Sequence, residues 1–269
     1  CYGPQDAETY GRIEPPAKSS PFPVDEMTPV YEAAAEDAVR GFENTQGYCL
    51  VLGCETGRLA AEIAKRTPMR IVAIDPDAQK VEAARRALDA AGLYGARVTI
   101  VQGDLSETPL PDYFANLIVS EDALVSGNLP PTPWEISRML KPLGGTIRIA
   151  QPLIAPARIE PIHAVPTKVW ANEVSVGGKE FWTVEESSDE FLLELVRGSL
   201  PGAGSWTHQY ANPGNTTCSD DQLIRCPLGV LWYGGPGPEQ MPERHRRSQA
   251  PLASNGRFFV IAEGLSEKL

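Results

Sequence analysis

The sequence predicts an α/β protein with a doubly wound, mostly parallel seven-stranded sheet and a C-terminal all-β fragment. Short apolar segments alternate with helical ones between residues 25 and 198, an order typical of a parallel sheet covered on both faces. Several predicted strands, such as Leu117-Ile118-Val119, are apolar throughout, which indicates burial from both sides. The last two predicted strands follow each other within a few residues, so we expect them to pair antiparallel.

The elements can be justified in chain order. Residues 1–24 are rich in Pro, Ser and Gly and predict an extended lead-in. A helix with apolar Val30, Ala34, Ala35 and Val39 is expected next. The predicted order then continues with strand 48–52, helix 58–66, strand 70–75, helix 77–91, strands 97–101 and 115–120, a helix around 133–141, and strand 145–150.

The pattern weakens after Gln151. Four prolines between residues 152 and 166 argue against a stable helix there. Residues 180–186 and 190–197 predict two strands joined by Ser187-Ser188-Asp189, a hairpin that would complete the sheet. We therefore expect one domain over residues 25–198 and a separate segment over residues 199–269, with little chain in 151–179 to form a lid over a substrate.

Composition excludes several classes of function. At 269 residues and 42% apolar, the chain can bury one full core. Its net charge of −11 argues against a nucleic-acid partner. No stretch reaches the roughly 20 apolar residues that span a bilayer. The five cysteines follow no metal-site spacing, so no metal is expected; Cys49 is expected to be buried, and Cys218 and Cys226 could pair if exported.

The segment from Tyr48 to Gly57 is the most informative. An apolar strand enters a glycine-bearing turn, the turn opens a helix at Arg58, and the next apolar strand ends on Asp75. Backbone N–H groups of such a turn approach a ligand closely, and an acid in this place can bind the two hydroxyls of a ribose. The order predicts an adenosine-type ligand; the alternative is a structural βαβ turn without one.

On these residues the chain resembles the class I S-adenosylmethionine-dependent methyltransferases over about residues 25–198. Gly53, Cys54, Thr56 and Gly57 match the glycine-rich loop, and Asp75-Pro76 matches the ribose-binding acid. Further matches are Gly103-Asp104-Leu105, the strand ending on Ser120, and Met139-Leu140-Lys141-Pro142-Leu143-Gly144-Gly145. The resemblance implies a Rossmann-like fold with S-adenosylmethionine as cofactor, held by Gly53, Cys54, Glu55, Gly57, Asp75, Pro76, Asp104, Leu105 and Ser120.

Two positions depart from the family pattern. Val51 stands where the family has an acid, and Glu55 replaces the middle glycine of the loop. Glu55 could face the carboxylate of the ligand, where like charges about 4 Å apart repel by roughly 4 kcal/mol at an effective dielectric of 20. Alternatively, Glu55 replaces the missing acid and meets the ammonium group of the ligand. The sequence leaves both interpretations open.

Methyl transfer to a hydroxyl or amine needs positioning and a general base. Glu121, after the fourth strand, is the candidate base, and the alternative is a pair of solvated acids, Glu121 and Asp122, in a loop. Val119-Ser120-Glu121-Asp122 lacks the Asn/Asp-Pro-Pro-aromatic signature of nucleic-acid amino methyltransferases. A small-molecule acceptor is therefore expected.

The C-terminal segment, about residues 201–263, resembles a blade of a pyrroloquinoline-quinone-type β-propeller. The resemblance depends on Trp206 with the Asn-rich residues after it, and on a predicted strand over residues 251–260, which ends in Asn255-Gly256-Arg257-Phe258-Phe259-Val260. A lone blade cannot bury its faces. We therefore expect the rest of the propeller in a longer parent chain, with pyrroloquinoline quinone bound only if the full propeller exists. Cys1, with no signal peptide ahead of it, fits either a lipid-modified terminus or a fragment, and the incomplete repeat favours a fragment.

Two hypotheses follow. The first is an enzyme that transfers a methyl group from S-adenosylmethionine to a small molecule. The second is a catalytically degenerate methyltransferase-like module within a quinone-type propeller protein. A cytoplasmic location is expected for the first and an exported or periplasmic location for the second.

Overall fold

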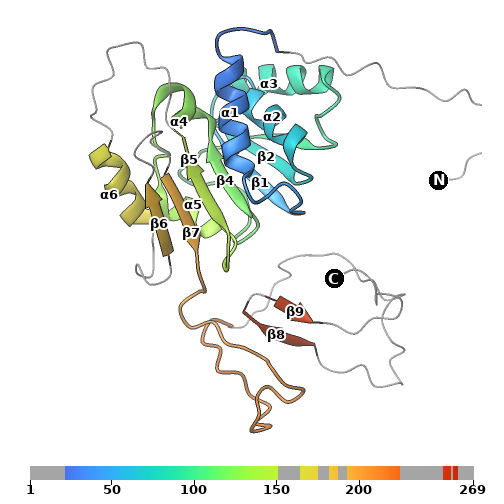
Figure 1. Cartoon of the computed structure of the whole chain (residues 1–269), viewed down its shortest axis with the longest axis vertical. Helices are drawn as coiled ribbons and strands as arrows, with labels where there is room; N and C mark the ends of the chain where they lie inside the picture. Colours follow the sequence, from blue (N-terminus) through green and yellow to red (C-terminus); the bar gives the residue numbers. More distant parts are fainter. Residues whose placement is uncertain are drawn as a thin grey trace, which may run out of the picture.

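The computed structural model describes residues 22–150, 164–174, 182–186, 193–224, 251–255 and 257–259 (Figure 1). Within them lies a seven-stranded sheet of order β3-β2-β1-β4-β5-β7-β6. The strands are β1 (Tyr48–Leu52), β2 (Arg70–Asp75), β3 (Val98–Gln102), β4 (Leu117–Ser120), β5 (Thr146–Ile149), β6 (Trp182–Glu186) and β7 (Leu193–Arg197).

The sheet is mostly parallel, as the sequence predicts. β1 pairs in parallel with β2 and β4, β2 with β3, and β4 with β5. β7 runs antiparallel to both β5 and β6, which confirms the predicted pairing of the last two strands. The residues of the predicted connecting turn, 187–189, lie outside the described residues.

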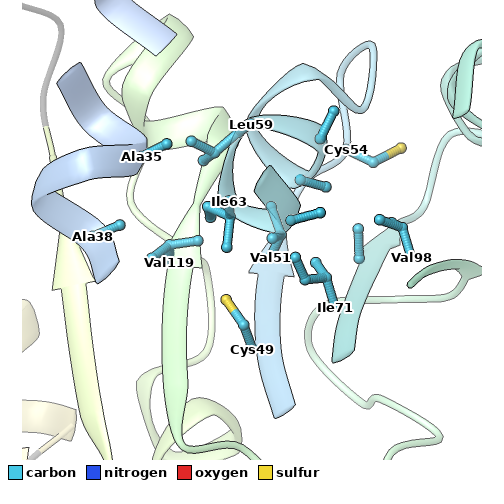
Figure 2. Close-up of a cluster of buried hydrophobic side chains, with 14 of the residues drawn as sticks. Ala35, Ala38, Cys49, Val51, Cys54, Leu59, Ile63, Ile71, Val98 and Val119 are labelled. Carbon is cyan, nitrogen blue, oxygen red and sulfur yellow. The ribbon is translucent and has the colours of Figure 1, made fainter. Parts of the chain in front are cut away.

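Helices cover both faces of this sheet (Figure 1). They are α1 (Thr28–Val39), α2 (Arg58–Arg66), α3 (Ala78–Ala90), α4 (Glu121–Ser126), α5 (Pro133–Met139) and α6 (Ala164–Val174). One buried cluster joins α1, α2 and α3 to the sheet, and Figure 2 shows Cys49 and Val51 of β1 within it. A second cluster joins α5 and α6 to the other face through Leu50 and Leu52. Successive β1 side chains thus enter opposite cores, which makes the sheet doubly wound.

Two helices were not predicted. α4 begins directly after β4, where the sequence left a loop of solvated acids as an alternative; Ser120 is its N-cap and accepts a hydrogen bond from the N–H of Ala123 at 3.0 Å. α6 lies within residues 151–179, where the sequence predicted no element, and only its first three residues fall in the proline-rich stretch 152–166. Pro166 is in the first turn of α6, where its missing N–H would have no intrahelical partner. Trp170 anchors this helix by donating to the carbonyl of Pro130 at 2.8 Å.

Two arginines, Arg58 and Arg148, hold α1 at its two ends. Arg58 of α2 forms an ion pair with Asp25 at 2.8 Å and donates to Thr28 at the N-terminus of α1. Arg148 of β5 donates to the carbonyls of Asp37, Ala38 and Arg40 at the C-terminus of α1, and its Nε bonds Glu194 of β7 at 2.6 Å. A cation beside the last carbonyls of a helix satisfies acceptors that have no partner within the helix.

The expected propeller blade finds no support in the described C-terminal residues. These contain a two-stranded antiparallel sheet, β8 (Leu252–Ser254) and β9 (Arg257–Phe259), with Trp206 bridged to Ala253. The segment predicted as one strand is therefore a hairpin. Asn255 has a φ of +47°, which suits the positive-φ position of a short hairpin turn.

Candidate functional site

The loop Gly53–Gly57 joins β1 to α2 where the strand order reverses between β1 and β4. In open α/β sheets the crevice outside the carboxyl ends of the strands at such a point is the usual ligand site. The N–H of Gly53 bonds the carbonyl of Ile74 at 2.9 Å, and that of Gly103 bonds the carbonyl of Asp75 at 3.1 Å. The ends of β1, β2 and β3 therefore lie side by side, as the sequence predicts.

The loop alternates positive-φ residues. Gly53, Glu55 and Gly57 have φ values of 75°, 29° and 77°. A Cβ on Gly53 would lie 2.9 Å from the Cβ of Asp122, and a Cβ on Gly57 would lie 3.1 Å from Leu88. The atoms around Gly53 and Gly57 therefore leave little room for a side chain at either position. Glu55 adopts a backbone conformation that residues with a side chain rarely take.

Asp75, the last residue of β2, links this strand to the loop that follows β1. Its side chain is buried, with Oδ2 accepting from the N–H of Cys54 at 2.9 Å and Oδ1 accepting from the N–H of Asp77 at 2.8 Å. The carboxylate of β2 is therefore fixed against the glycine-rich loop of β1. Each carboxylate oxygen keeps further lone pairs for a ligand hydroxyl.

The other predicted site residues lie at the same edge. Asp104 is exposed and accepts from both the N–H and the hydroxyl of Ser106 at 2.8 Å; these bonds lower its pKa. Leu105 packs against the second core, and Pro76 is exposed. Ser120 is buried and donates to the carbonyl of Leu52 at 3.2 Å while it caps α4. Its hydroxyl is thus already engaged within the protein.

Glu55 forms an ion pair with Lys80 of α3. The hydrogen bond to Glu55 raises the pKa of Lys80, and the charges of Asp75 and Asp122 raise it further. Lys80 therefore compensates the charge of Glu55. The estimate of about 4 kcal/mol for repulsion between Glu55 and the ligand carboxylate assumed a charge without such a partner. The sequence analysis did not identify Lys80 as the ion-pair partner of Glu55. The observation that could have indicated it is a lysine in the first turn of the helix capped by Asp77.

Glu121 is fully buried at the start of α4. Its Oε1 accepts from the N–H of Leu59 at 3.3 Å, and its Oε2 is buried with no hydrogen-bond partner among the described residues. Burial raises the pKa of Glu121 to about 8; the N–H of Leu59 and the Tyr31 hydroxyl oppose that rise, and the charge of Glu55 adds to it. The alternative of an exposed acid in a loop is therefore wrong.

Tyr31 of α1 couples to this carboxyl group. Burial and then the charge of Glu121 raise the pKa of Tyr31. A cavity of ≈ 20 Å³, about the space of one water, lies between α1, α2 and the ends of β4 and β5 and is lined in part by Leu59, Ser120 and Leu124. Sequence reasoning missed Tyr31, whose signal was an aromatic residue within the otherwise small apolar positions of the first helix.

Cys54, also a predicted site residue, is buried within the loop (Figure 2). Burial raises the pKa of its thiol, and Asp75, Glu121 and Glu55 raise it further, so the thiol is neutral. Cys49 is buried as predicted, while Cys218 is exposed and its predicted partner Cys226 lies outside the described residues. Among the described residues no three His, Cys, Asp or Glu side chains are placed to hold a metal ion.

Comparison with known proteins supports the methyltransferase resemblance. A family model for methyltransferase domains matches residues 49–144. A search of curated protein sequences finds no match. No helix within the described residues has the length and apolar character that crossing a membrane requires.

Two solved structures share the fold. A protein from Methanococcus maripaludis assigned as an S-adenosyl-L-methionine-dependent methyltransferase aligns with a TM-score of 0.55 and 22% identity, covering 65% of this chain and 88% of its own. An S-adenosylmethionine-dependent methyltransferase from Aquifex aeolicus aligns with a TM-score of 0.50 and 16% identity, covering 64% and 93%. The chain therefore has a methyltransferase-like Rossmann domain, and neither comparison supports a propeller.

Proposed function

We propose that this chain binds S-adenosylmethionine and transfers its methyl group to a small molecule. The observation that carries the proposal is the Asp75 carboxylate, which the N–H of Cys54 fixes against the loop at the strand-order reversal. The matched family segment, residues 49–144, contains both of these residues.

The residues present fit the cofactor. Asp75 is fixed and has oxygen lone pairs for ribose hydroxyls, and the exposed Asp104 stands on the neighbouring loop for the adenine. The loop from Gly53 to Gly57 and the loop residues Pro76 and Leu105 would complete the binding surface. When bound, the cofactor supplies the methyl group; the protein contributes orientation, exclusion of water and, through the raised pKa of Glu121, a group able to accept a proton near neutral pH.

The proposal is tested by isothermal titration of S-adenosylmethionine into the purified chain. We expect saturable binding that Asp75→Ala weakens by at least tenfold. Asp75→Asn keeps the shape and one acceptor oxygen, so it should retain part of the affinity. Absence of binding, or equal binding by the wild type and Asp75→Ala, would overturn the proposal.

A further inference from the structure

Five carboxyl-bearing residues surround the Gly53–Gly57 loop, and charge pairing neutralises only two of them. Arg58 pairs with Asp25, and Lys80 pairs with Glu55. The other three, Asp75, Asp122 and Glu121, have no ion-pair partner within 4 Å among the described residues. Asp75 and Glu121 are also almost completely buried. Asp75 and Asp122 therefore leave this edge of the sheet with an excess of negative charge, to which Glu121 adds where it is ionised.

The burial of Glu121 distinguishes this group of acids from a cluster on the solvated surface. Its Oε2 is buried and has no hydrogen-bond partner among the described residues. A buried acceptor left without a bond is costly, and a ligand that supplies positive charge nearby recovers part of that cost. Glu121, Asp75 and Glu55 all act on the Cys54 thiol, so the three carboxyl groups converge on the loop itself.

We propose that Asp75, Asp122 and Glu121 make this site selective for a cationic ligand, so that S-adenosylmethionine binds more tightly than its demethylated product. The inference rests on the proposed function. S-adenosylmethionine carries a sulfonium and an ammonium against one carboxylate, a net charge of about +1, whereas the product is a neutral thioether with no net charge. Transfer of the methyl group thus removes the charge that the site retains, which favours release of the product.

Cofactor binding should also change the protonation of Glu121. Free Glu121 is partly protonated at pH 7.5, because burial raises its pKa to about 8. A bound cation favours the ionised form, so cofactor binding should release a fraction of a proton from the protein. The groups that face Glu121 are Tyr31 of α1, Glu55 and the Cys54 thiol of the loop, and the backbone N–H groups of Arg58 and Leu59 in α2. The guanidinium of Arg58 is engaged by Asp25.

The test titrates S-adenosylmethionine and S-adenosylhomocysteine into the wild type, Glu121→Gln and Glu82→Gln. Glu82→Gln is the matched control because it removes one negative charge from the exposed face of α3. We expect the wild type and Glu82→Gln to prefer S-adenosylmethionine by about tenfold or more at low salt, and Glu121→Gln to lose most of that preference.

Repeating the titrations in buffers of different ionisation enthalpy gives a second readout. We expect cofactor binding to release more protons from the wild type than from Glu121→Gln. The release that remains in Glu121→Gln measures the contribution of the ligand's own amino group. Equal or tighter binding of the product by the wild type would overturn the selectivity while leaving the proposed function intact. Binding of neither ligand would overturn both. If Glu121→Gln keeps the wild-type preference for S-adenosylmethionine and the wild-type thermal stability, the proposed role of Glu121 in the selectivity is wrong.

Discussion

Replacing Glu55 by glycine and by alanine measures the strain in the loop. Glu55 has a φ of +29°, and its carboxylate pairs with Lys80, whose side chain is 39% exposed. A residue with a Cβ at positive φ costs about 1–2 kcal/mol, whereas glycine in an ordinary conformation is about 0.5–1 kcal/mol worse than alanine. At position 55 the first effect is larger, so we expect Glu55→Gly to be more stable than Glu55→Ala by about 0.5–1 kcal/mol.

Both variants also lose the ion pair between Glu55 and Lys80. A partly exposed pair contributes at most about 1 kcal/mol, so Glu55→Ala should lose that amount while Glu55→Gly should lie close to the wild type. Urea unfolding followed by far-UV circular dichroism measures both differences. If Glu55→Ala equals or exceeds Glu55→Gly in stability, the backbone at residue 55 is not strained and the reasoning fails.

Three further predictions concern the scaffold. Arg148→Ala should lower the free energy of unfolding by about 2–4 kcal/mol and speed hydrogen exchange in α1, since three carbonyls lose their donor; unchanged exchange in α1 would contradict this. The ion pair with Arg138 lowers the pKa of Glu135 to about 2, so its stabilisation is present above pH 5 and is lost as pH falls towards 2. The stability gap between wild type and Glu135→Gln should therefore narrow from pH 6 to pH 3, and a constant gap would refute the assignment. Leu117→Ala, in the core, should cost about 2–5 kcal/mol by urea unfolding, whereas Val24→Ala, with Val24 93% exposed, should change stability by less than about 0.5 kcal/mol.

Much of the fold followed from the sequence because its strands carry strong local signals. The apolar runs of β1, β2 and β4 are long enough to identify, and parallel strands place their carboxyl ends at one edge. The adjacency of Gly53 and Asp75 was therefore predictable. α6 was not, because its single proline lies in the first turn and costs little there, although prolines generally argue against a helix.

The side-chain arrangement of the site was less predictable. Glu55 and Lys80 are 25 residues apart, and only the packing of α3 beside the loop brings them together. The burial of Glu121 depends on α1 and α2 covering it, which its local sequence of two acids after a strand does not reveal. The Asn255-Gly256 pair was a signal that could have been used, since this dipeptide is typical of a tight hairpin turn.

The contact between Arg148 and α1 has a consequence for synthesis of the chain on the ribosome. Arg40, whose carbonyl accepts from Arg148, is separated from it by 108 positions. At about 5–20 residues per second, the ribosome needs roughly 5–20 s to supply the arginine after Arg40 has been made. During that interval α1 lacks its C-terminal anchor, so α1 is secured only after β5 has been made, although it precedes the other described helices in the chain. A nascent chain stalled before residue 148 should expose α1 to protease, and one stalled well beyond Arg197 should protect it.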